Sequence, residues 1–111
     1  MDEDPRVRAR LKNDMEEAKR QYEEYGEWYE RVFETVLISE IELPAPWSIG
    51  RLDNNKKKLQ ATGAMPPILL DFDDSSQTYK ISDGIHRTNA AKQLGYTHVP
   101  AVVTYRRIYS P

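Results

Sequence analysis

The chain has 111 residues, which is enough for one domain with a modest core and too few for two. Hydrophobic residues make up 39% and charged residues 31%, as in a folded protein, and the absence of cysteine excludes disulfides, thiolate metal sites and cysteine nucleophiles. No apolar run is long enough to span a bilayer and the charged N-terminus does not resemble a signal peptide, so we expect a soluble, cytoplasmic protein without a membrane partner.

The net charge of −2 is unevenly distributed along the chain. Residues 1–33 contain ten acids and seven bases, whereas residues 34–111 contain eight acids and nine bases. Neither part supplies the cationic surface on which non-specific nucleic-acid binding depends. A nucleic-acid partner therefore has little support from charge.

Residues 1–35 are expected to form an N-terminal helical arm, followed by a domain over residues 36–111. Asp4-Pro5 supplies an N-cap and a proline at the first helical position. Larger side chains then recur with spacings of three and four, at Met15, Ala18, Tyr22, Tyr25, Tyr29, Val32 and Val36. This stripe predicts packing on the chain's own domain, or a loose helix pair in a homodimer, rather than a coiled coil, because tyrosines fit a narrow seam poorly.

The next elements follow from apolar runs and turn signals. "ETVLISEIEL" (residues 34–43) is rich in β-branched residues and predicts a first strand, which "LPAPWS" ends. A short helix is expected from Arg51 to Ala61. "ILLDF" and "TYKIS" predict two strands, and "DDSSQ" between them predicts a hairpin turn, so these strands should be antiparallel.

The stretch "YKISDGIHRTNAAKQLG" (residues 79–95) predicts a strand that turns through Gly84 into a helix from about Ile85 to Leu94. "AVVTYRRI" predicts the last strand. After the arm, the order of elements is β-α-β-β-α-β, which predicts a small α/β or α+β domain with a mixed sheet.

Three motifs in this order, "PPILLDF", "YKISDGIHRTNAAKQLG" and "VPAVV", resemble the ParB/sulfiredoxin superfamily over roughly residues 36–108. The most specific part is Gly84-x-His86-Arg87 directly after a strand. The resemblance implies a nucleotide-binding fold, which sulfiredoxins use with ATP to activate a sulfinic acid, ParB proteins use to bind and hydrolyse CTP, and free-serine kinases use to transfer phosphate. It thus implies a nucleoside triphosphate or diphosphate as ligand, ATP or CTP above all.

The chain departs from two branches of this superfamily. Ile85 stands where sulfiredoxins place a catalytic cysteine directly before the histidine, which excludes the sulfiredoxin reaction. The sequence ends at Pro111, just after the last strand, so we expect none of the helix-turn-helix and dimerisation regions of chromosome-partitioning ParB proteins.

The candidate phosphate site is the first turn of the helix after Gly84. Its N–H groups and the guanidinium of Arg87 attract an anion, and the resemblance implies that His86 and Arg87 bind phosphate. Thr88 and Asn89 can add hydrogen bonds if they face the turn. In the alternative interpretation, Arg87 pairs with Asp83 and His86 only caps the turn.

Asp83 has three roles open to it. A carboxylate beside a triphosphate is repelled unless a cation lies between them, which predicts Mg²⁺ as a companion held by Asp83. Asp83 can instead act as a general base towards a substrate hydroxyl. It can also simply satisfy the N–H groups of the turn, as Asp-Gly pairs do.

Other candidates lie outside this motif. Glu40 and Glu42 are expected at the end of the first strand, on the same face. The resemblance implies that one of them serves as a general base near the nucleotide, as an acidic residue from this region does in the related kinases. In the lysine run 56–58, Lys57 can reach the nucleotide if it faces the site, and a solvated face is the alternative. We expect Trp47 to pack in the core rather than stack on a base, and His98 to lie at the surface.

Three functional hypotheses follow. The first is nucleotide binding, extended to Mg²⁺-dependent phosphoryl transfer or hydrolysis of the nucleotide. The second is a non-catalytic interaction or dimerisation module that uses the helical arm. The third is a DNA-binding or ParB-like nuclease protein.

Overall fold

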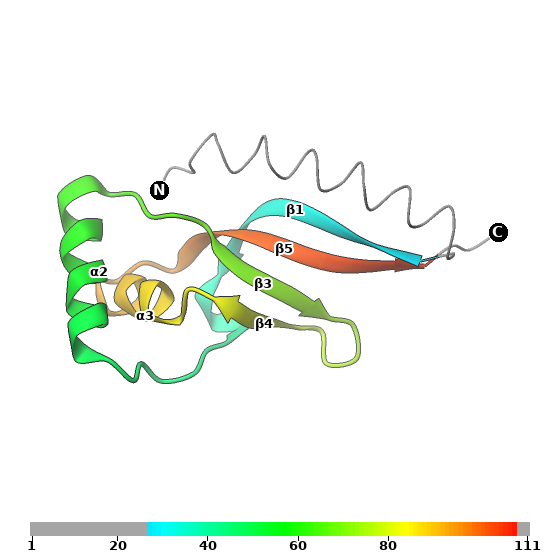
Figure 1. Ribbon diagram of the computed structural model, residues 1–111, viewed down its shortest axis with the longest axis horizontal. Helices are drawn as coiled ribbons and strands as arrows, with labels where there is room; N and C mark the ends of the chain where they lie inside the picture. Colours follow the sequence, from blue (N-terminus) through cyan, green and yellow to red (C-terminus); the bar gives the residue numbers. More distant parts are fainter. Residues whose placement is uncertain (1–26, 109–111) are drawn as a thin grey trace.

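The computed structural model of this protein describes residues 27–108, which form a five-stranded mixed sheet with two helices beside one end of it (Figure 1). The strands are β1 (Glu27–Leu37), β2 (Ile41–Glu42), β3 (Ile68–Asp73), β4 (Thr78–Asp83) and β5 (His98–Ile108). The helices are α2 (Ile49–Thr62) and α3 (Ile85–Gln93), and a 3₁₀ turn, η1, spans Ile38–Glu40. The predicted fold class is confirmed.

The strands lie in the order β1-β5-β3-β4-β2. β3 and β4 form the predicted antiparallel hairpin, whereas β3 pairs with β5 and β4 pairs with β2 in parallel. β1 and β5 are long antiparallel partners over eleven residue pairs, from Glu27–Ile108 to Leu37–His98. The sheet is therefore mixed, and β4 lies between the hairpin partner and the short strand β2.

The prediction that the helical arm continues to residue 35 is wrong, because residues 27–37 form β1. The spacing of Val32 and Val36 does not distinguish the two structures, since residues four apart share one face of a helix and also one face of a strand. In the structure Val36 is buried and Val32 half-buried on the same side of β1. Pairing with β5 satisfies the backbone of this segment, and this long-range term decides in favour of a strand.

The single strand predicted over residues 34–43 is also wrong in detail. The end of β1, η1 and the two-residue β2 divide this segment, and the N–H of Ile38 donates to the carbonyl of Thr97 at 2.9 Å where the chain turns. Ile38 and Ile41 are both buried on either side of the turn. The break moves the chain from one edge of the sheet to the other.

The core lies between the sheet and the helices. β3 shows the alternation of a half-buried strand, with Ile68 and Leu70 buried and Leu69 exposed. The main buried cluster consists of Val36, Ile38, Ile41, Leu59, Met65, Ile68, Leu70, Ala91, Val99, Ala101 and Val103. Helix α3, which follows β4 after Gly84, is packed into this core through Ala91.

The rest of the predicted arm, and the homodimer that it would support, lie outside the described residues. The boundary between arm and domain stays a prediction apart from β1, which belongs to the sheet. Neither α2 nor α3 is long and apolar enough to cross a membrane.

Candidate functional site

Gly84 joins β4 to α3 in a conformation that other residues adopt only under strain. Its φ is 105°, and a Cβ atom placed on it would lie 2.6 Å from Cγ2 of Ile68 and 3.1 Å from Nη2 of Arg87. The turn is therefore pressed onto β3 at a place where only glycine fits. This contact fixes where α3 begins.

The first turn of α3 lacks a side-chain cap. Gly84 is the N-cap residue, and the first turn contains no acidic side chain. The N–H and the Oγ1 hydroxyl of Thr88 both donate to the carbonyl of Gly84, at 2.9 and 2.8 Å, and these two bonds stabilise the first turn of the helix. The amides that precede Thr88 therefore form an uncapped, partially positive helix end.

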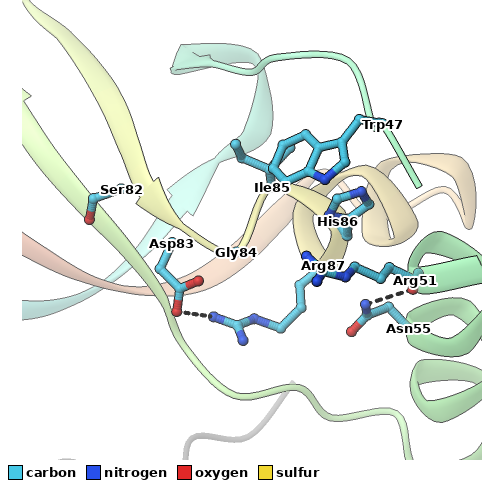
Figure 2. A pocket seen from close by; sticks show the side chains of 9 residues that line it. All are labelled: Trp47, Arg51, Asn55, Ser82, Asp83, Gly84, Ile85, His86 and Arg87. Carbon is cyan, nitrogen blue, oxygen red and sulfur yellow. Dashed lines mark hydrogen bonds and ion pairs between the residues drawn. The ribbon is translucent and has the colours of Figure 1, made fainter.

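Arg87 lies beside this helix end, and its guanidinium makes two long polar contacts with the protein. Its Nη2 donates to the carbonyl of Pro67 at 3.3 Å and meets Oδ2 of Asp83 at 3.4 Å (Figure 2). Both contacts are long for a guanidinium, and charge-assisted bonds normally measure about 2.7–2.9 Å. The Nε of Arg87 is buried and has no hydrogen-bond partner among residues 27–108. The side chain as a whole is 23% exposed, so the guanidinium can still be reached by a further acceptor.

His86 connects α3 to the loop before α2. Its buried ring accepts a hydrogen bond at Nε2 from the backbone N–H of Ser48 at 3.1 Å. The donor is a backbone amide, so this nitrogen carries no proton in the arrangement. The ring also lies edge-on to Trp47, with centroids 4.4 Å apart. Through these two contacts His86 joins helix α3 to the loop before α2.

These elements enclose an open pocket of about 220 Å³ at the junction of β4, α3 and the start of α2 (Figure 2). It is lined by Trp47, Arg51, Asn55, Ser82, Asp83, Gly84, Ile85, His86 and Arg87. The charged groups in the lining are two arginines and one aspartate, in addition to the positive end of α3. An anion fits this balance of charge.

Three lining residues from the α2 side were not among the predicted site residues. Arg51 and Asn55 lie one turn apart on α2, where Nδ2 of Asn55 donates to the carbonyl of Arg51 at 2.8 Å. Trp47 is 65% exposed, so the prediction that it packs in the core is wrong. The i, i+4 spacing of Arg51 and Asn55 after "PAPWS" was the available signal, but the sequence does not tell which way that face of α2 points.

Four predicted residues lie elsewhere. Thr88 and Asn89 are buried, and Nδ2 of Asn89 donates to the carbonyls of Pro44 at 3.0 Å and Ile85 at 2.9 Å, so both side chains bind backbone rather than line the pocket. Lys57 is exposed on α2 and does not line the pocket. Glu40 is exposed in η1, also outside it.

Glu42 belongs to a separate surface cluster. Its carboxylate accepts hydrogen bonds from Nζ of Lys80 at 2.9 Å and from Oγ1 of Thr78 at 3.1 Å. These bonds, with that from Lys80 the stronger cause, lower the pKa of Glu42. Because η1 interrupts the strand, Glu40 and Glu42 do not share a strand face as predicted. Neither carboxylate lines the pocket, so no contact supports their predicted role as general bases.

Among residues 27–108 no group of three or more histidine or carboxylate side chains gathers as a metal site. Asp83 is the single carboxylate in the lining of the pocket, and its side chain is 65% exposed. It therefore offers one protein ligand to a cation that is otherwise held by water or by a bound anion. His98, as predicted, lies at the surface.

Comparison with known proteins identifies the family. The sequence model of the ParB N-terminal domain matches residues 31–107. This chain belongs to the ParB N-terminal domain family. The match includes β4, the Gly84 turn and α3, so the pocket lies within the family domain, and the matched region begins inside β1.

Solved structures share the fold of this ParB N-terminal domain. Sulfiredoxin from Arabidopsis thaliana superposes with a TM-score of 0.57 at 18% identity, over 65% of this chain and 83% of that one. SbnI from Staphylococcus aureus gives 0.55 at 26%, over 70% of this chain and 31% of that one. A free serine kinase in complex with AMP gives 0.57 at 23%, over 66% and 30%.

The chain therefore spans about a third of the SbnI and serine kinase structures, so it is similar to one part of each. At these identities the likeness to sulfiredoxin and the kinase shows the fold. A search of curated protein sequences gave no match.

Proposed function

We propose that this ParB N-terminal domain binds a nucleoside diphosphate or triphosphate, with the phosphates at the first turn of α3. The observation that carries the proposal is the guanidinium of Arg87, which lines the pocket beside an uncapped helix end and makes only long contacts with Asp83 and Pro67. The free serine kinase of the same fold has been solved with AMP and with ADP, which supports a nucleotide as the ligand.

Each group in the pocket has a task in this proposal. The backbone N–H groups at the start of α3 would donate to phosphate oxygens, and Gly84 fixes the position of that helix start because a Cβ atom there would collide with Ile68. Arg87 would exchange its long contact with Asp83 for a shorter charge-assisted bond to phosphate. Arg51, on the opposite wall, would supply a second positive charge.

Asp83 is a suitable ligand for the predicted magnesium ion. Mg²⁺ is usually held by one or two carboxylates together with substrate phosphates and water, and Asp83 is an exposed carboxylate at the same pocket. When bound, the ion would offset the repulsion between Asp83 and the phosphates. Any phosphoryl transfer or hydrolysis here would use Asp83 as ligand or base, because Glu40 and Glu42 lie outside the lining.

The test is calorimetric titration of the folded chain with ATP, ADP, CTP and GTP, each with and without Mg²⁺. Arg87→Ala should weaken binding by about 1.5–3 kcal/mol, the usual worth of a hydrogen bond to a charged group. Lys92→Ala is the matched control, because it removes one positive charge from α3 at an exposed position that does not line the pocket. It should change the affinity less than about twofold.

Absence of heat with all four nucleotides, in a chain shown to be folded by circular dichroism, would disprove the proposal. An equal loss in the Arg87 and Lys92 variants would show that only the overall charge matters. In that case Arg87 would have the purely structural role of pairing with Asp83.

A further inference from the structure

Trp47 is a large apolar side chain that the fold leaves at the surface. It is 65% exposed, and it lines the pocket beside His86 (Figure 2). Ile49 is more exposed, at 78%, but it does not line the pocket, so exposure alone does not mark a ligand surface. Trp47 differs because its exposed ring belongs to the pocket lining, where a bound ligand would cover it.

The loop that carries Trp47 is held in place on both sides. The carbonyl of Pro44 accepts from Nδ2 of Asn89 at 3.0 Å, and the N–H of Ser48 donates to Nε2 of His86 at 3.1 Å. Between these two bonds the indole ring packs edge-on against the His86 ring. Trp47 is thus positioned before any ligand arrives, so little conformational entropy is lost when a flat group lies on it.

The size of the pocket limits what it can enclose. Its volume of about 220 Å³ is below the roughly 300–1,000 Å³ of pockets that enclose a whole small molecule. A nucleotide whose phosphates lie between Arg51 and Arg87 therefore extends out of the pocket at its other end. Trp47 belongs to the same lining and is itself exposed, so it is available to that end.

We infer that Trp47 is a stacking platform for the nucleobase of the bound nucleotide, an inference that rests on the phosphate site proposed above. Stacking uses the π-face that every base has, so the platform serves purines and pyrimidines alike. It favours nucleotides over inorganic phosphates and sugar phosphates, which carry no flat ring. The pocket would then recognise the ligand at two ends, by charge and by stacking.

The experiment compares ADP with inorganic pyrophosphate in calorimetric titrations of the full chain and of Trp47→Ala, Trp47→Phe and Ile49→Ala. Loss of a stacking contact should weaken ADP roughly 5- to 150-fold in Trp47→Ala and much less in Trp47→Phe. Pyrophosphate should bind both Trp47 variants within twofold of the wild type. Ile49→Ala is the control, because Ile49 is 78% exposed, close to Trp47 in sequence, and outside the lining.

The outcomes separate the two proposals. If the wild type binds pyrophosphate and ADP equally well, or if Trp47→Ala weakens both ligands alike, the platform is overturned while the phosphate site stands. If neither ligand binds to the folded wild type, both proposals are overturned. Quenching of tryptophan emission by ADP in the wild type, lost in Trp47→Phe, is the spectroscopic result expected from stacking.

Discussion

Replacement of Gly84 by alanine tests the packing that sets the geometry of the pocket. The new Cβ would lie 2.6 Å from Cγ2 and 2.9 Å from Cβ of Ile68, which is fully buried. Left-handed backbone costs an L-residue about 1–2 kcal/mol, and an overpacked core costs about 1–3 kcal/mol. We therefore expect Gly84→Ala to lower the free energy of unfolding by about 2–5 kcal/mol.

Two other glycines separate the two contributions. Gly63 also has a positive φ, of 68°, but a Cβ there meets nothing within 4 Å, so Gly63→Ala should show the backbone cost alone, about 1–2 kcal/mol. Gly50 lies in α2 with open space around it and no such φ, and alanine there should stabilise the fold by up to about 1 kcal/mol.

Urea unfolding followed by circular dichroism measures all three variants, provided that the m-value stays constant. The reasoning predicts that Gly84→Ala is the most destabilised and that Gly50→Ala is at least as stable as the wild type. Equal costs for the Gly84 and Gly63 variants would refute it, because the contact with Ile68 would then contribute nothing.

Two further predictions concern single side chains. Asp83→Asn should abolish the Mg²⁺ dependence of nucleotide affinity and, without metal, strengthen binding by up to about fivefold, because a repelling carboxylate is gone. Unchanged Mg²⁺ dependence in calorimetric titrations would exclude Asp83 as a metal ligand. Asp74→Asn, on the hairpin, is the control. Burial, and next the hydrogen bond to Glu34, raise the pKa of Tyr105. The folded state then keeps a proton that the unfolded state loses above pH 10, so stability should fall as pH rises from there; urea midpoints of Tyr105→Phe between pH 9 and 11 should show less of this fall, and an identical fall would contradict the cause.

The elements that the sequence predicted well are those with local signals. The β3–β4 hairpin follows from two apolar runs around "DDSSQ", and α3 follows from Asp-Gly before a helical run. β1 could not be separated from a helix, because its apolar spacing suits both structures and the choice depends on β5, more than sixty residues later. Whether such a segment forms a helix or a strand depends on its long-range partner.

The two sides of the pocket also differ in how well the sequence predicted them. Its α3 side was readable, because Asp83, Gly84, His86 and Arg87 lie within five consecutive residues of one motif. Its α2 side was not, because contacts between distant residues place it. The bonds from Ser48 to His86 and from Asn89 to Pro44 join residues 38 and 45 positions apart.

The central claim is that phosphate binds at the start of α3, and amide chemical shifts test it most directly. In ¹H–¹⁵N spectra of the labelled chain, addition of ADP should move the amides of Ile85, His86 and Arg87 most strongly, in proportion to bound ligand. Shifts centred instead on another pocket of the described residues, which Tyr96 and His98 help to line on the start of β5, would contradict the account. So would a spectrum that does not change at all.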